Sequence, residues 1–204
     1  MLRLLLATAL VLPLSIHYGE AIVQMLMPLY RAIFERIGED FHIIFFGLDK
    51  RGAESVIRVD IRLTHALVVG GHLVFPDPRG TANVTTLVIQ TIQPVAVALI
   101  AALAWPCPSM ARALVRLSSL IFFLLVMTAL DAPFLLAGEM WGLIINRMSP
   151  GADSMLVSWS QFLQGGGRVV LGVVAVLCSL AVEGAFTFRH AQGERASNFT
   201  WPYQ

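Results

Sequence analysis

The sequence predicts an α-helical membrane protein, a bundle of four transmembrane helices with a small extracytoplasmic antiparallel β element between helices 1 and 2. Three observations predict this class. Of the 204 residues, 57% are hydrophobic and only 13% are charged, whereas a soluble domain carries about 25% charged residues. Long uncharged runs recur along the chain. One short stretch, residues 55–63, instead alternates apolar and charged side chains, as a strand with one wet face does.

The stretch from Asn83 to Pro106 contains the clearest transmembrane signal. No residue from Val84 to Trp105 is charged. At ~1.5 Å per residue this run reaches roughly 33 Å, enough to cross a ~30 Å hydrocarbon core. Trp105 stands where an aromatic side chain would lie among the lipid headgroups. We therefore predict that this stretch is the second transmembrane helix.

The first 38 residues are predicted to form a signal-anchor helix followed by an interfacial helix. Residues 4–27 are mostly apolar after one basic residue, Arg3, and no small-x-small cleavage site follows the first apolar run. Pro28 permits a kink. In Leu29–Ile37 the apolar residues fall on one helical face, a pattern typical of a helix that lies at the membrane surface.

Residues 39–82 are predicted to form the extracytoplasmic hairpin or sheet. Phe41–Leu48 is rich in Ile and Phe, Asp49–Gly52 reads as a turn, and Ile57 to Leu63 alternate with charged residues. A third apolar run covers His72–Phe75. We expect two or three antiparallel strands at the membrane surface, with the apolar face resting on the interfacial helix or on a partner because two strands alone are marginal in water.

Residues 83–204 are predicted to contain three transmembrane helices. After the central span, the next spans are Leu117–Ala137 and Val169–Phe188. The loop of residues 138–168 contains two amphipathic pieces, Trp141–Met148 and Met155–Leu163. The polar tail Arg189–Gln204 is expected to be poorly ordered.

The distribution of basic residues predicts the orientation. Arg112 and Arg116 occupy a short loop with no acid nearby, and basic residues near both termini outnumber acids. Basic residues in short loops mark the cytoplasmic side. We therefore expect a multi-pass membrane protein with both termini cytoplasmic and the sheet and the 138–168 loop outside.

This topology predicts a polar layer within the membrane. Glu20, Gln90, Gln93 and Asp131 would all lie roughly 10 Å below the outer surface, counting ~1.5 Å per residue, with His17 one turn deeper. Carboxyl groups in a span normally face the bundle interior or a polar cavity. Two interpretations remain open. The side chains could hydrogen-bond across helices and fix the bundle, or they could line a pocket for a partner's transmembrane segment or for a proton.

Several other functions are not favoured by the sequence. A net charge of +1 gives no argument for nucleic acid. Cys107 and Cys178 show neither metal-ligand spacing nor a disulfide framework, and we predict no metal, cofactor or catalytic residue. Gly165–Gly167 lack the following Lys-Ser/Thr of a phosphate-binding loop. They are interpreted as a flexible entry to the last helix, with Arg168 in contact with lipid headgroups.

Three stretches resemble a family of bacterial membrane proteins that accompany the H-type exosortase. They are Leu26-Met-Pro-Leu-Tyr-Arg with Phe41 and the following turn and Val56-Ile-Arg-Val-Asp strand, Ile89-Gln-Thr-Ile-Gln-Pro ending in Ala104-Trp-Pro, and Phe162-Leu-Gln-Gly-Gly-Gly-Arg. Exosortases are transpeptidase-like enzymes that process proteins bearing a C-terminal sorting tag. Their Cys-Arg-His constellation is not matched here, so the resemblance implies a partner of the enzyme rather than the enzyme.

The resemblance therefore implies a non-catalytic accessory protein of a bacterial inner membrane, in an exosortase-type protein sorting or processing system. It would dock a polytopic membrane protein, such as an exosortase, or its substrate. Two alternatives stay open: a small membrane enzyme or transporter that uses Glu20, His17 and Asp131, and a structural membrane oligomer.

Overall fold

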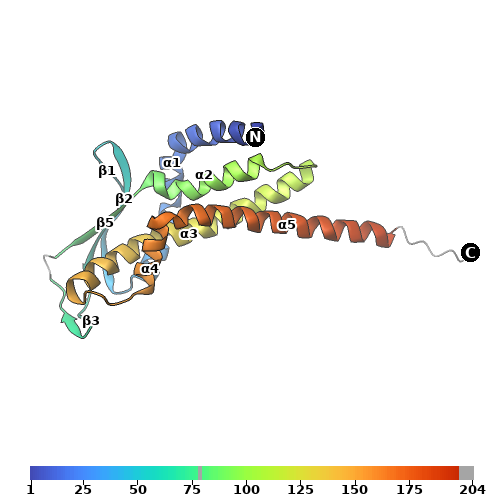
Figure 1. Cartoon of the computed structure of the whole chain (residues 1–204). Coiled ribbons are helices and arrows are strands. Elements are labelled where there is room, and N and C mark those ends of the chain that lie inside the picture. The colour runs from blue at the N-terminus through green and yellow to red at the C-terminus, as the bar shows by residue number, and fades with distance from the viewer. Residues whose placement is uncertain (78–79, 198–204) are drawn as a thin grey trace, which may run out of the picture.

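A computed structural model describes residues 1–77 and 80–197 of the chain (Figure 1). In this part of the chain, one long helix is followed by five strands and then by the remaining helices. The elements are α1 Leu2–Ile37, β1 Phe41–Arg51, β2 Glu54–Leu63, β3 Leu67–Val69, β4 His72–Val74, β5 Ala82–Leu87, α2 Val88–Ala104, α3 Met110–Met148, α4 Met155–Phe162, the π-helical turn η1 Leu163–Gly167, and α5 Arg168–Ser197.

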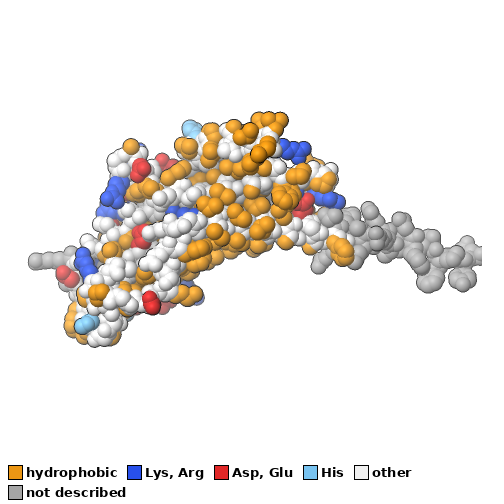
Figure 2. Space-filling model, in the orientation of Figure 1, with side chains coloured by type: hydrophobic (Ala, Val, Ile, Leu, Met, Phe, Trp, Pro, Cys, Tyr) orange, Lys and Arg blue, Asp and Glu red, His pale blue; other side chains and the backbone are white. Residues whose placement is uncertain are grey.

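The structure is that of a helical membrane protein with a small antiparallel sheet. Three helical stretches are long and apolar enough to cross a membrane: Leu2–Ile37, Met110–Met148 and Met155–Phe186. α2 is apolar but shorter. Figure 2 shows apolar side chains gathered over the helical bundle, with charged side chains mainly toward the two ends of the molecule. An exposed apolar surface of this extent is the surface that lipid would cover.

α1 is one continuous helix, Leu2–Ile37, which includes both the predicted signal anchor and the predicted short helix Leu29–Ile37. Pro13 and Pro28 both lie inside it. Small residues at every fourth position, among them Ser15 and Gly19, are buried, and they let α1 approach α2 closely. Figure 1 shows that α1 bends, with its first part near α2 and its last part behind the sheet.

The predicted strands in residues 41–63 are confirmed as an antiparallel hairpin. β1 and β2 pair from Phe41↔Leu63 to Arg51↔Glu54, and Gly52 makes the turn with φ of 66°. On β2 the apolar residues are buried, with Ile57 at 0% exposure. On the opposite face Arg58 donates to Asp49 and Asp60 at 2.8–2.9 Å, and these hydrogen bonds from Arg58 hold the pKa of Asp49 below its usual value.

The third strand of this sheet lies where the sequence predicted the start of a transmembrane helix. β5, Ala82–Leu87, pairs antiparallel with β2, and the strand order is β1-β2-β5. α2 therefore begins only at Val88 and has 17 residues, about 25 Å at ~1.5 Å per residue. The apolar run near His72 does form a strand, β4, but it pairs with β3 in a separate hairpin.

α3 is much longer than the predicted span of residues 117–137. Its 39 residues also include the amphipathic piece Trp141–Met148, so most of the predicted 138–168 loop is helical. The first half of α3 exposes apolar side chains such as Phe122, whereas the second half buries Leu136 and Met140. The predicted piece near Met155 forms α4.

α5 continues beyond the predicted span. It extends to Ser197, so residues 189–197 of the tail that we expected to be poorly ordered are helical. Residues 198–204 of that tail lie outside the described part of the chain.

One hydrophobic cluster joins the sheet to the helices. It combines residues of α1, such as Tyr30 and Phe34, with Ile57 and Val59 of β2 and Met140 of α3. The sheet therefore shares its hydrophobic core with one end of the helical bundle. The region where the two meet is called the junction below.

Candidate functional site: a polar cavity between the sheet and the bundle

A buried ion pair lies at the junction of sheet and bundle. Arg168, the first residue of α5, donates from Nε to Oδ1 of Asp131 on α3 at 2.8 Å. The two side chains are only 4% and 0% exposed. Removing both charges from water costs several kcal/mol per ion, roughly, unless each finds partners. The stability of the pair therefore depends on the other hydrogen bonds that its two side chains make.

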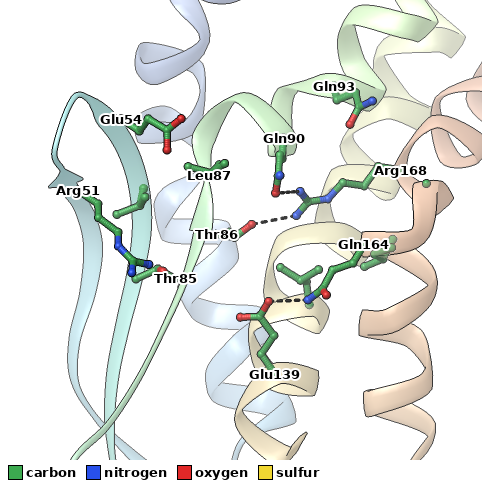
Figure 3. A pocket seen from close by; sticks show the side chains of 14 residues that line it. Arg51, Glu54, Thr85, Thr86, Leu87, Gln90, Gln93, Glu139, Gln164 and Arg168 are labelled. Carbon is green, nitrogen blue, oxygen red and sulfur yellow. Dashed lines mark hydrogen bonds between the residues drawn. The ribbon is translucent and has the colours of Figure 1, made fainter. Parts of the chain in front are cut away.

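The remaining donors of Arg168 reach two further elements. Nη1 donates to Oε1 of Gln90 on α2, and Nη2 donates to Oγ1 of Thr86 on β5, each at 3.1 Å. Figure 3 shows both bonds converging on the guanidinium. The planar fork of an arginine suits this geometry, because its donors point in fixed, divergent directions. One side chain thus ties α5 to α3, α2 and β5.

The glycine run before Arg168 shapes its approach. Leu163–Gly167 form a π-helical turn between α4 and α5, in which Gly166 has φ of 107°. A Cβ on Gly167 would lie only 2.7 Å from the carbonyl oxygen of Phe162. Glycine is therefore the only residue that fits at position 167 without a shift of the backbone. π-helical turns are frequent at functional sites. Here the turn precedes the arginine that reaches into the protein.

This placement corrects the expected role of Arg168. The sequence predicted contact with lipid headgroups, but the side chain is buried and its hydrogen bonds go to protein groups. The physical reason is Asp131. A carboxylate inside a helix bundle is costly unless a cation lies nearby, so Arg168 pairs with Asp131 rather than with a lipid headgroup.

A cavity of about 620 Å³ opens above the ion pair (Figure 3). Its lining is mostly amide, hydroxyl and charged groups. Across it, Glu139 of α3 accepts a hydrogen bond from Nε2 of Gln164 at 2.7 Å. The lining residues come from β1, β2, β5, α2, α3, η1 and α5: Arg51, Glu54, Val56, Thr85, Thr86, Leu87, Gln90, Gln93, Leu135, Glu139, Leu163, Gln164, Gly166 and Arg168.

The structure brings together only part of the predicted polar layer. Gln90 and Asp131 are joined through Arg168, and Gln93 lines the same cavity. Glu20 lies elsewhere. It accepts a hydrogen bond from Ser55 at 3.2 Å and lines a different cavity of about 400 Å³ between α1 and the hairpin. His17 is exposed, with its ring against Tyr18 at 4.7 Å between centroids.

Sequence reasoning missed the pairing of Arg168 and six polar residues that line the cavity: Arg51, Glu54, Thr85, Thr86, Glu139 and Gln164. Thr86 was assigned to a helix, and Arg51, Glu139 and Gln164 were assigned to loops. One signal was available: Asp131 is the only charged residue of the predicted span 117–137. An acid in such a span requires a basic partner at the same depth, and Arg168 begins the next long helix.

A second buried ion pair lies at the far end of the bundle. Nε of Arg116 donates to Oε2 of Glu183 at 2.7 Å, and its other nitrogens donate to carbonyls at the end of α2, including that of Trp105. Arg116 precedes Asp131 by 15 residues on α3, and Arg168 precedes Glu183 by 15 on α5. At ~1.5 Å per residue, the two pairs lie about 22 Å apart.

The described residues offer few groups for metal binding or thiol chemistry. Within residues 1–77 and 80–197 no group of three or more His, Cys, Asp or Glu side chains is placed to hold a metal ion. Cys107 is exposed in the turn after α2, Cys178 is half-buried in α5, and both are free thiols.

Comparison with known proteins gives no relative. No family model matches the chain, and neither the curated proteins nor the solved structures contain a match.

Proposed function

We propose that this chain is a non-catalytic accessory protein of a bacterial inner membrane, which docks a polytopic enzyme or its substrate in an exosortase-type protein sorting system. The observation that carries the proposal is the cavity above Arg168. The guanidinium of Arg168 in this cavity already binds Asp131, Gln90 and Thr86. The lining therefore offers hydrogen-bonding groups for recognition. The three stretches that resemble exosortase-associated proteins supply the class of partner.

The proposed topology has four membrane-spanning helices, α1, α2, α3 and α5. Each exposes large apolar side chains, for example Leu10, Leu103, Phe122 and Leu177. α2 is short, but β5 leads directly into it and Trp105 follows it. In this arrangement both termini are cytoplasmic, while the sheet and α4 lie outside with the cavity facing the extracytoplasmic surface.

Thiol labelling of intact cells tests this topology. The hairpin tip is probed by Ala53→Cys in a chain whose Cys107 and Cys178 are both changed to Ser. The opposite turn is probed by the native Cys107, with only Cys178 changed to Ser. An impermeant maleimide is expected to label position 53 in intact cells and Cys107 only after the membrane is opened, because the two turns lie at opposite ends of α2. Labelling of both from the same side would contradict the topology.

Partner retention tests the function. The tagged chain, solubilised from its native membrane in mild detergent, is expected to co-purify with a polytopic membrane enzyme of the exosortase type. Mass spectrometry of the eluate identifies the retained proteins, and an unrelated four-span protein with the same tag serves as the control. If the eluate contains no polytopic protein above this control, the accessory role is wrong.

A further inference from the structure

The cavity above Arg168 continues as a groove along β5. A second cavity, of about 420 Å³, runs between β5, α3 and α4. Arg51, Thr85, Glu139 and Gln164 line both cavities, so the two adjoin along β5. One wall of the groove is β5 from Asn83 to Leu87, and the other is formed by α3, α4 and η1.

The strand along this groove is at the edge of its sheet. In the order β1-β2-β5, the only strand that pairs with β5 among the described residues is β2. In an antiparallel ladder, alternate residues of an edge strand direct N–H and C=O away from their neighbour. Such a row of unpaired groups is a template for another strand. β5 has six residues, about 20 Å at ~3.3 Å per residue.

The opposite wall complements a polypeptide backbone. Asn146, Gln161 and Gln164 line it, and an amide side chain both donates and accepts hydrogen bonds, as a peptide group does. The charged lining residues are two arginines, Arg51 and Arg168, and two glutamates, Glu54 and Glu139. Asp131 already neutralises Arg168, which leaves Arg51 against two glutamates, a net charge of only about −1. Such a groove disfavours a strongly acidic occupant and attracts a strongly basic one only weakly.

A glycine keeps the groove open. Gly142 of α3 lines the second cavity, and a Cβ at this position would meet only methyl groups of Val157, at 3.8 and 4.0 Å. These are ordinary van der Waals distances. The Cβ of a larger residue at position 142 is therefore accommodated without strain, and the rest of its side chain would occupy space in the groove.

We propose that this groove binds an extended polypeptide segment of low net charge, which adds to β5 as a further strand. Main-chain hydrogen bonds to β5 supply affinity, and the polar wall selects the side chains. This inference rests on the proposed function, since it names the form in which a partner or substrate is recognised. About six residues of the segment would pair with β5, and its inner end would lie beside Gln90 and Gln93 at the mouth of the bundle.

The test uses the purified full-length chain in detergent and a displayed library of random dodecapeptides. Selection is expected to enrich peptides of low net charge with alternating side-chain preferences. Gly142→Phe fills the groove and is expected to weaken binding of the enriched peptides on the order of tenfold or more. Gly184→Phe is the matched control, because position 184 on α5 has open space around its Cβ and lies far from the groove.

Hydrogen exchange gives a second measurement that does not depend on the variants. An enriched peptide is expected to slow exchange at amides of Asn83–Leu87 and to leave the other sheet edge, β1, unchanged. The proposal is wrong if no peptide is enriched over empty micelles, if Gly142→Phe and Gly184→Phe bind equally, or if β5 gains no protection. Because this test uses the isolated chain, it can fail while partner retention succeeds, and the reverse.

Discussion

Replacement of Arg168 by Met is expected to lower the free energy of unfolding by about 3–5 kcal/mol. The variant keeps most of the side-chain volume but leaves the carboxylate of Asp131, which is 0% exposed, without its cation. Gln90 and Thr86 lose their hydrogen bonds to the guanidinium as well. Unfolding by SDS in mixed micelles, followed by far-UV circular dichroism, measures the change.

The double variant Arg168→Met/Asp131→Leu separates the charge from the packing. Because both buried charges are then absent, most of the lost stability is expected to return. Arg3→Met serves as the control, since Arg3 is exposed and outside the junction. If Arg168→Met unfolds within about 0.5 kcal/mol of the Arg3→Met variant, as an ordinary surface substitution would, the ion pair does not stabilise the fold.

Replacement of Gly138 by Ala is expected to cost about 1–3 kcal/mol through overpacking. A Cβ on Gly138 would collide with the carbonyl oxygen of Leu156 and would lie 2.7 Å from Cβ of Ser160. Since both of these belong to α4, the added methyl group would force α4 away from α3. The same unfolding assay measures the loss.

Gly142→Ala is the matched comparison, one helical turn further along α3. Its new methyl group meets Val157 at ordinary contact distance, and Ala is a better helix former than Gly by up to about 1 kcal/mol. The variant is expected to be as stable as the wild type or slightly more stable. Equal losses at positions 138 and 142 would show that close α3–α4 contact is not the cause.

The elements that the sequence predicted well are those with a strong local period. β2 alternates because Arg58 and Asp60 lie on its more exposed face while Ile57, Val59 and Ile61 face the core. The long apolar helices could be predicted because their uncharged runs are longer than those of a helix buried in the core of a soluble domain.

β5 could not be predicted in the same way. Val84–Leu87 is uncharged, and an uncharged run is compatible with both a membrane span and a buried strand. Pairing with β2, a long-range contact, decides between them. The boundary at Val88 therefore became visible only with the tertiary structure.

The candidate site was predicted in part for a similar reason. Asp131 and Gln90 stand out because polar groups are rare in these helices. Arg168 was assigned to the headgroups because it stands at a helix start, where snorkelling is common. The tertiary structure is needed to show that the guanidinium instead points inward, where it bonds to Asp131, Gln90 and Thr86.

The equal spacing of the two buried ion pairs has a mechanical consequence for α3 and α5. A slide of one helix past the other by one turn, ~5.4 Å, would separate Arg168 from Asp131 and Arg116 from Glu183 at the same moment. Piston-like movement between these helices is thus opposed at both ends.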